Sequence, residues 1–316
     1  MTKLRISIVQ YLNTAPLVWG FTHGPLAGKY ELSFTVPSQC AEALRAGEAD
    51  IAIIPAIEYQ RIEGLMMMPD LAIASKKQVR SLLLVAKEPI AEVRSIALDS
   101  SSRSTQALTR ILCADRWRIA PEFFEAAPDL DAMLQEADAA LLIGDPALRL
   151  AIALEGTARR DANGVLVCPA GAGVPDTAGL DAVGVDGAGR EGSGELHVYD
   201  MVEEWQRSTG LPAVLAVWAA RDGVANEEVL QDFAASRDFG LAHIAEISEV
   251  AAFELKLPAA AMAEYLRRNI DYSLDEANQR GLEHFFARAA ALGLIARDSA
   301  IRWAGHAKPL HQAVRI

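Results

Sequence analysis

The stretch that decides the fold is Ile96–Leu108, IALDSSSRSTQAL, in which a short apolar strand leads directly into the start of a helix. Apolar residues at helical spacing continue to Leu112, as expected for the buried face of that helix. Backbone N–H groups at a helix start lack intrahelical partners, and the helix dipole favours an anion there. Serine hydroxyls and one guanidinium therefore make this turn a candidate seat for a carboxylate or phosphate. The alternative is that Ser102 or Ser104 only caps the helix.

Strands and helices alternate on both sides of this stretch. The first series consists of predicted strands at 4–9, 30–36, 50–55 and 79–86, with a helix that opens at Pro37 and closes at Gly47. The second series consists of strands at 96–98, around 117–119 and at 139–143, with helices at 105–113 and 129–135. This alternation predicts parallel sheets flanked by helices. Because two similar series follow one another, we expect an α/β protein of two lobes.

The expected lobes are discontinuous in sequence. We assign residues 1–88 and 215–316 to lobe I and residues 89–214 to lobe II, joined by strand-like crossings near 82–90 and 210–218. In such a fold a ligand sits in the cleft between the lobes, at the carboxyl ends of strands and the starts of helices.

Two parts of the chain stand apart from the alternation. Residues 157–198 are punctuated by glycine and have no sustained periodicity, which predicts an irregular insertion or a hairpin, with a lid as the alternative. The last third is helical: Leu257-Pro258 opens one helix, and Ser273–Glu276 fits a capping box before another.

The composition excludes several classes of protein. The chain has 316 residues, 51% of them hydrophobic, and a formal net charge of −12. Nucleic acid and anionic membranes need a basic surface, so we expect neither as a partner. Cys40, Cys113 and Cys168 are widely spaced, which supports neither a disulfide framework nor a zinc site. Without a recognisable signal peptide or an apolar stretch long enough for a bilayer, the sequence predicts a cytoplasmic protein.

Polar residues follow the predicted strands of the first series. Asn13 and Thr14 come after the first strand, where an amide is suited to orienting a hydroxyl or carboxylate. A helix N-cap is the alternative for Asn13. Glu58 follows the strand at 50–55, and its alternative is a favourable interaction with a helix dipole. Arg80 and Ser81 fall on opposite faces of the next strand, so we expect only Ser81 to reach a ligand.

The second series adds a carboxylate to this set. Asp145 follows a buried strand and a glycine, which suits a hydrogen bond to a substrate hydroxyl. Its alternative is a turn or cap before Pro146. The sequence has no phosphate-binding loop, no Gly-x-Gly-x-x-Gly motif that follows a predicted strand and no zinc-protease or serine-hydrolase motif. The six histidines also lie away from these strand ends in sequence. The residues thus predict a site for a small anionic molecule and leave open whether that molecule reacts.

Several of these segments together resemble the chorismate dehydratases of the futalosine route to menaquinone. The similarity is carried by RISIVQYLNT (5–14), ADIAIIPAIEY (49–59), IASK (73–76) with VRS (79–81), LDSSSRS (98–104), LIGDPA (142–147) and residues 200–218. It covers most of the chain except the Gly-rich insertion. The resemblance implies the two-lobed fold of type 2 periplasmic binding proteins in a cytoplasmic enzyme. It also implies that chorismate loses water to give 3-[(1-carboxyvinyl)oxy]benzoate.

The resemblance also implies roles for individual residues. Asn13 and Ser81 become the expected catalytic positions. The expected substrate-binding residues are Thr14, Glu58, Ser100, Ser101, Ser102, Arg103, Ser104 and Asp145. The serine and arginine turn would hold one carboxylate of chorismate, and Asp145 or a water would assist departure of the hydroxyl. Three candidates for the base stay open: the substrate's own enolpyruvyl carboxylate, a group held by Asn13 and a water. We expect no cofactor and no metal, and chorismate rather than nucleic acid or a membrane as the partner; the oligomeric state is left open.

Three alternatives remain at this stage. A sister family in the same pathway cleaves a cyclic futalosine derivative with a histidine base in the second lobe, but the strand at 139–145 offers no histidine. A non-catalytic solute-binding protein would share the fold and the anion seat, but would ordinarily need an export signal. A ligand-sensing regulatory domain would be attached to a helix-turn-helix, whereas this sequence begins with a strand.

Overall fold

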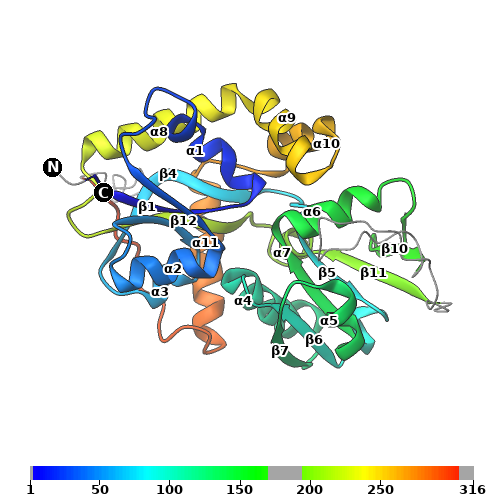
Figure 1. Ribbon diagram of the computed structural model, residues 1–316. Coiled ribbons are helices and arrows are strands. Elements are labelled where there is room, and N and C mark those ends of the chain that lie inside the picture. Colours follow the sequence, from blue (N-terminus) through cyan, green and yellow to red (C-terminus); the bar gives the residue numbers. More distant parts are fainter. Residues whose placement is uncertain (1–2, 170–193, 306–316) are drawn as a thin grey trace. The chain divides into compact units, whose positions relative to one another are not determined.

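The structure is a computed structural model that describes residues 3–169 and 194–305, and the chain divides into two compact units (Figure 1). Unit 1 comprises Met1–Lys76 with Leu211–Ile316, and unit 2 comprises Lys77–Gly210. These divisions differ from the expected ones at 88 and 214, because the segments expected to cross between lobes each pair within a single sheet. The strand at 82–86 pairs along its whole length in unit 2, and the strand that begins at Ala213 pairs in unit 1.

Unit 1 is built on a five-stranded sheet in the order β2-β1-β3-β12-β4. Its strands are β1 (Arg5–Val9), β2 (Glu31–Thr35), β3 (Ile51–Pro55), β4 (Leu65–Ser75) and β12 (Ala213–Arg221). The strands β1, β2 and β3 are parallel, and β12 runs antiparallel to both β3 and β4. Every residue of β3 is buried, as expected for a continuous apolar run in the middle of a sheet. The carboxyl ends of β1, β3 and β4 therefore share one edge.

Helices cover both faces of this sheet. They are α1 (Ala15–Thr22), α2 (Pro37–Ala46), α3 (Glu58–Arg61), α8 (Glu227–Ala242), α9 (Ile244–Leu255), α10 (Ala259–Glu264) and α11 (Glu276–Ala291). Figure 1 shows α1 and α8 side by side on one face, with α2 and α11 on the other. A Cβ at Gly240 of α8 would lie 1.9 Å from the carbonyl oxygen of Pro16, so only glycine permits this close helix packing. Phe21, Trp218 and Phe233 fill the space beneath these two helices with edge-to-face ring contacts.

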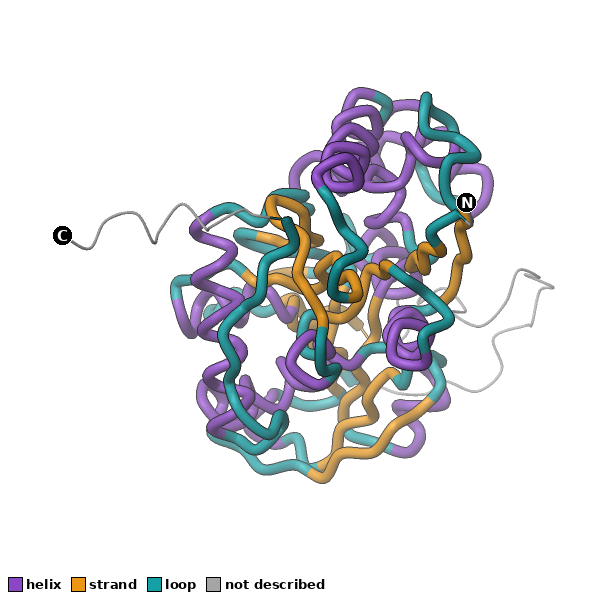
Figure 2. Tube along the Cα trace, turned by 90° about the vertical axis from the view of Figure 1, so that its left-hand side faces the viewer, coloured by secondary structure: helices purple, strands orange, loops and turns teal. Residues whose placement is uncertain are grey.

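Unit 2 is built on a seven-stranded mixed sheet in the order β7-β6-β8-β5-β11-β10-β9. Its strands are β5 (Leu82–Ala86), β6 (Ser95–Asp99), β7 (Glu122–Ala126), β8 (Ala139–Ile143), β9 (Arg159–Arg160), β10 (Leu166–Pro169) and β11 (Glu195–Asp200). The strands β6, β7 and β8 are parallel, whereas β5 runs antiparallel to β8 and to β11. The strands of the described chain are traced in orange in Figure 2.

The helices of unit 2 are α4 (Arg103–Leu112), α5 (Leu130–Glu136), α6 (Gly144–Ala153) and α7 (Met201–Thr209). Alternate residues of the strands, such as Leu83, Val85 and Leu142, form one apolar cluster with α5 and α6. The helices α4 and α7 contact each other and form a second helical layer. Each buried strand therefore packs against a helix layer on both of its faces, which explains why its sequence is apolar at every position.

Two local predictions were wrong. The segment expected to be a strand around 117–119 is instead a π-helical turn, Cys113–Trp117, that extends α4 and ends at Arg118 with a φ of 55°. The indole of Trp117 is held there by Glu204 and by edge-to-face contact with Tyr199. The predicted capping box also differs, because Asp275 rather than Ser273 caps α11.

The Gly-rich segment predicted at 157–198 lies mostly outside the described residues. Its described ends form β9, β10 and the start of β11, which pair antiparallel at one side of the unit 2 sheet. Within residues 3–169 and 194–305, no helix combines the length and apolarity needed to cross a membrane.

Candidate functional site

Four segments of unit 2 meet at one edge of its sheet. The strands β6, β8 and β11 end there, at Asp99, Ile143 and Asp200, and β5 begins there at Leu82. The register confirms this arrangement, because Leu82 is paired with Ile143 and Asp200 with Leu83. The helices α4, α6 and α7 follow these strand ends at once, so three helix N-termini lie along the edge. Such an edge concentrates outward N–H groups and the positive ends of helix dipoles.

Asp99 organises the loop before α4. Its side chain is fully buried. Its Oδ1 accepts the backbone N–H and the hydroxyl of Ser101, at 2.9 and 2.6 Å, and its Oδ2 accepts the N–H of Ile143 at 3.3 Å. Burial raises the pKa of this carboxyl, against the opposing effect of these hydrogen bonds. Asp99 thus ties the end of β6 to the end of β8.

The hydroxyls of the predicted anion seat have different partners. Ser102 caps α4, since its hydroxyl accepts the N–H of Thr105 at 3.3 Å. Ser101 donates its hydroxyl to Asp99. Both side chains therefore shape the loop, so the alternative of a simple cap holds for Ser102. Ser100 is exposed, Arg103 is partly exposed as the first residue of α4, and Ser104 is buried in its first turn.

Ser81 lies just before β5 and is buried, with 1% of its surface exposed. Its carbonyl oxygen accepts the backbone N–H of Gly144 at 2.8 Å. Gly144 has a φ of 66°, a left-handed conformation that strains other residues. Asp145 follows in the first turn of α6 and is partly exposed. The structure therefore brings Ser81 and the start of α6 together.

Arg80 and Asp200 determine the turn that precedes Ser81. Arg80 has a φ of 65° and lies outside the strand, so the predicted alternation of faces does not apply to it. Its guanidinium pairs with Glu155. Its backbone N–H and that of Val79 both donate to Oδ2 of Asp200, at 2.6 and 2.9 Å.

Asp200 is also the N-cap of α7. Its Oδ1 accepts the N–H groups of Val202 and Glu203, at 3.0 and 3.1 Å. Burial raises the pKa of this carboxyl to about 6, although four backbone N–H groups favour its charged form. Asp200 thus joins the start of α7 to the turn before β5.

In unit 1, Asn13 and Thr14 follow β1 in a single 3₁₀ turn, Leu12–Thr14. Asn13 is partly exposed and Thr14 is buried. The Thr14 hydroxyl donates to Oδ1 of Asn13 at 3.3 Å. No side chain caps the start of this turn or of α1, so the structure does not support the alternative of an N-cap for Asn13. The amide lies at the carboxyl end of β1, as the sequence predicted.

Glu58 begins α3 and is fully buried. Its Oε2 pairs with Arg45 at 2.5 Å and its Oε1 pairs with Arg61 at 2.9 Å. A carboxylate held between two guanidinium groups is a sufficient explanation of its burial. The contact of Glu58 with a substrate stays a prediction.

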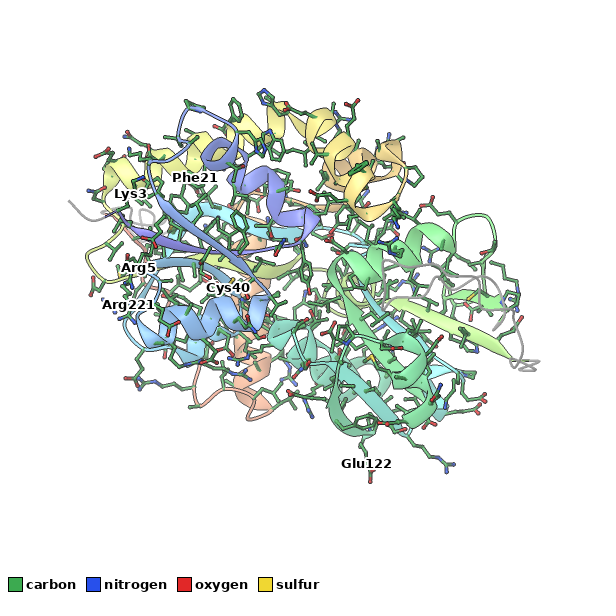
Figure 3. The ribbon with its side chains drawn as sticks, in the orientation of Figure 1. Lys3, Arg5, Phe21, Cys40, Glu122 and Arg221 are labelled. Atoms are coloured by element: carbon green, nitrogen blue, oxygen red, sulfur yellow. The ribbon has the colours of Figure 1, made fainter. Side chains whose placement is uncertain are left out.

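A separate hollow of about 750 Å³ opens at the amino end of the unit 1 sheet and is lined by Lys3, Arg5, Tyr30, Glu31 and Asp50. Lys3 and Arg5 are labelled in Figure 3. Its main charges are paired with each other, since Arg5 donates to both oxygens of Asp50. Among the described residues, no group of His, Cys, Asp and Glu side chains is arranged to hold a metal ion.

The histidine of unit 2 lies away from the edge that contains Ser81. His197 is the one histidine in the sequence of unit 2. It lies on β11 opposite Ala86, the last residue of β5. Three residues of strand separate it from Asp200, which corresponds to about 10 Å. A histidine base in unit 2 is therefore not available at this edge.

Two residues of this edge were not among the predicted site residues. Asp99 and Asp200 each stand at the end of a strand and before a helix, where an aspartate is a common cap. Only the tertiary fold reveals their distant partners, Ile143 and the turn at Arg80.

Comparisons with known proteins agree with the fold. A solved protein of Archaeoglobus fulgidus matches with a TM-score of 0.62 and 18% identity, covering 93% of this chain and 98% of that one. The periplasmic aliphatic sulphonate binding protein SsuA of Escherichia coli matches with a TM-score of 0.57 and 17% identity, covering 99% of this chain and 96% of that one. The expected periplasmic-binding-protein fold is therefore confirmed.

Sequence relatives point to a pathway. A chorismate dehydratase of Thermus thermophilus is 27% identical over 291 residues, covering 92% of this chain and 95% of that protein. A family model described as menaquinone biosynthesis matches residues 4–161 and 189–291. The chain belongs to this menaquinone biosynthesis family.

Proposed function

We propose that this protein is a chorismate dehydratase, which removes water from chorismate to give 3-[(1-carboxyvinyl)oxy]benzoate. The observation that carries the proposal is the edge of unit 2, where Ser81 and three helix N-termini meet and from which the one histidine of unit 2 lies apart on β11. Such an edge suits an anionic substrate that needs orientation rather than a strong protein base. The similarity to the Thermus thermophilus dehydratase supports the same reaction.

The chemistry of chorismate explains why a modest set of polar groups is enough. The ring loses a hydroxyl and the neighbouring hydrogen as water, and the product ring is aromatic. Removal of that hydrogen leaves negative charge that spreads toward the ring carboxylate. The protein therefore has to bind two carboxylates, hold the ring in a reactive orientation and stabilise the developing charge.

We assign Asn13 and Ser81 to the reacting ring. Asn13 offers both a donor and an acceptor, and it is not used as a helix cap. Ser81 brings a hydroxyl, and its carbonyl oxygen accepts the N–H of Gly144 at the start of α6. Thr14, which donates to the Asn13 amide, orients that side chain.

We assign the binding of one substrate carboxylate to the turn before α4. Arg103 supplies a positive charge at a helix N-terminus, where the dipole already favours an anion. Ser101 and Ser102 act by shaping the turn through their bonds to Asp99 and Thr105. Ser100, three residues before Arg103, and Ser104, directly after it, complete the proposed binding residues of this turn.

The remaining assignments concern proton transfer. We assign the base to the enolpyruvyl carboxylate of chorismate, since His197, the one histidine of unit 2, lies on β11 opposite Ala86 and away from Ser81. Asp145, in the first turn of α6, or a water assists departure of the hydroxyl. No cofactor takes part in this scheme, and the cytoplasm is the compartment in which we expect the protein to act.

Three substitutions test these assignments. Asn13→Ala, Ser81→Ala and Arg103→Ala are each incubated with chorismate, and the benzoate product is quantified. Matched controls are Ser95→Ala, a serine at the start of β6 on the opposite edge of the sheet, and Arg110→Ala in the last turn of α4. We expect the three variants to lose at least tenfold in kcat/KM and the controls less than threefold. Full turnover by all three variants would refute the assigned roles.

A further inference from the structure

We propose that Asp200 is a positioning residue for Ser81, an inference that rests on the proposed catalytic role of Ser81. In this proposal Asp200 does not touch the substrate. It fixes the turn that leads into Ser81 through hydrogen bonds to the backbone of Val79 and Arg80, and it couples that turn to the start of α7.

The geometry shows one carboxylate serving two segments. Oδ2 of Asp200 accepts two consecutive N–H groups, from Val79 and Arg80, which lie 121 and 120 residues away in sequence. Oδ1 accepts the N–H groups of Val202 and Glu203 in the first turn of α7. The side chain is nine-tenths buried, so water does not readily replace these bonds.

The turn before Ser81 needs such a clamp. Arg80 has a φ of 65°, which costs about 1 kcal/mol or more for a residue other than glycine. The bond from its N–H to Asp200, at 2.6 Å, holds that conformation. On the other side of the turn, Gly144 holds the carbonyl oxygen of Ser81 at 2.8 Å. Ser81 is therefore fixed from both sides. Asp200 holds the residues before it, which no strand pairing holds.

Replacing Asp200 by asparagine changes the charge and the number of acceptor oxygens but not the size of the side chain. Asparagine has one acceptor oxygen, and its NH₂ group only donates. Asp200→Asn therefore keeps an acceptor for one pair of N–H groups and presents a donor to the other pair. The amide can accept from only one of the two pairs, so the side chain no longer holds the turn before Ser81 and the start of α7 together, while its volume is unchanged.

Asp138 provides a matched control within the same sheet. Its Oδ2 also accepts two consecutive N–H groups, from Arg94 and Ser95, at 2.9 and 3.1 Å. This clamp lies at the start of β6 and β8, which is the opposite edge from Ser81. Asp138→Asn therefore removes the same kind of interaction at a place where no catalytic position is proposed.

The test is a double-mutant cycle between Asp200→Asn and Ser81→Ala, with kcat for chorismate as the readout. We expect Asp200→Asn to lower kcat at least tenfold in the unmodified protein and less than threefold in the Ser81→Ala background, because the hydroxyl that it positions is then absent. Asp138→Asn should lower kcat less than threefold in both backgrounds. If Ser81→Ala has no measurable rate, the amide exchange of Val79 and Arg80 described below decides the proposal instead.

An equal loss of kcat in both backgrounds would overturn the proposal, since a purely structural defect adds to the loss of Ser81. A loss below threefold for Asp200→Asn in the unmodified protein would overturn it as well. Amide hydrogen exchange separates this failure from that of the proposed function. We expect Asp200→Asn to speed exchange at Val79 and Arg80 at least tenfold and not at Arg94 and Ser95. If the unmodified protein leaves chorismate intact, the proposed function fails, while the exchange result still tests the clamp.

Discussion

The backbone N–H of Gly144 donates to the carbonyl oxygen of Ser81 at 2.8 Å, so the first residue of α6 directly holds the residue before β5. The bond requires Gly144 to adopt a φ of 66°, in the left-handed region. A residue with a Cβ is strained there by about 1–2 kcal/mol. Replacing Gly144 should therefore affect both the stability of the fold and the position of Ser81.

Gly144→Ala should lower both stability and activity. We expect a loss of about 1–2 kcal/mol in the free energy of unfolding and a drop of about tenfold in kcat, because relief of the strain moves the N–H away from Ser81. Gly156→Ala is the control, since Gly156 has a φ of 80° and open space around its Cβ position. It should show a similar loss of stability in denaturant titrations with unchanged kcat. Equal activity in the two variants would contradict the coupling.

Arg103→Ala should act mainly on substrate binding. A partly exposed guanidinium at a helix start attracts a carboxylate before and during the reaction, so we expect KM to rise at least tenfold with kcat changed less than threefold. Arg110→Ala, in the same helix, should leave KM within twofold, because that guanidinium stacks on the ring of Phe123 at 4.2 Å. Added salt should raise KM for the unmodified protein more than for Arg103→Ala. An unchanged KM in Arg103→Ala would show that the carboxylate binds elsewhere.

Glu58→Gln should reduce stability without changing KM. The substitution leaves Arg45 and Arg61 beside a buried neutral group, and we expect a loss of about 2–3 kcal/mol. Glu42→Gln removes the half-exposed partner of Arg45 and should cost less than about 1 kcal/mol. Denaturant titrations measure both losses. A rise in KM for Glu58→Gln would restore this residue to the substrate site.

Asp200 should give stability an unusual dependence on pH. Its pKa is about 6 in the folded chain, against 3.8 as the ordinary value. Between these values the folded chain holds a proton that the unfolded chain has released, so stability falls as pH rises. The contribution is fully present below pH 3.8 and lost above pH 6, and it amounts to up to about 3 kcal/mol. The free energy of unfolding of the unmodified protein should therefore decline relative to Asp200→Asn over this window.

Asp138 should show the opposite sign. The N–H of Arg94 is the main cause that holds the pKa of this carboxyl below its ordinary value. Its contribution is therefore present above the unfolded pKa and lost as pH falls through the folded pKa. The gap between the unmodified protein and Asp138→Asn should shrink on acidification. If the gap in free energy of unfolding from the unmodified protein changed with pH in the same direction for Asp200→Asn and Asp138→Asn, the assigned environments of the two carboxyl groups would be contradicted.

The sequence was sufficient where local and tertiary preferences agree. The apolar runs at 50–55 and 139–143 are β3 and β8, and the Ile96–Leu108 stretch is a strand, a loop and a helix as expected. The sequence pattern was misleading around Trp117, because the indole packs against Tyr199 and Glu204, 82 and 87 residues further along the chain. Contacts at that separation leave no local signal, so an apolar and aromatic segment was interpreted as a strand.

The site was predictable to the level of strand ends and no further. The sequence located Ser81, Arg103 and Asp145 at strand ends or helix starts, and the structure brings their segments to one sheet edge. It did not reveal Asp200, because the same aspartate before α7 is also a plain helix cap. The added function of its second oxygen depends on Val79 and Arg80, which reach it only in the folded chain.

The most direct test of the proposed function is the mass spectrum of chorismate after incubation with the purified protein. A dehydratase predicts a product lighter than chorismate by one water, with the ultraviolet absorption of an aromatic benzoate. Chorismate that is bound but recovered unchanged would identify a binding protein and contradict the proposed reaction.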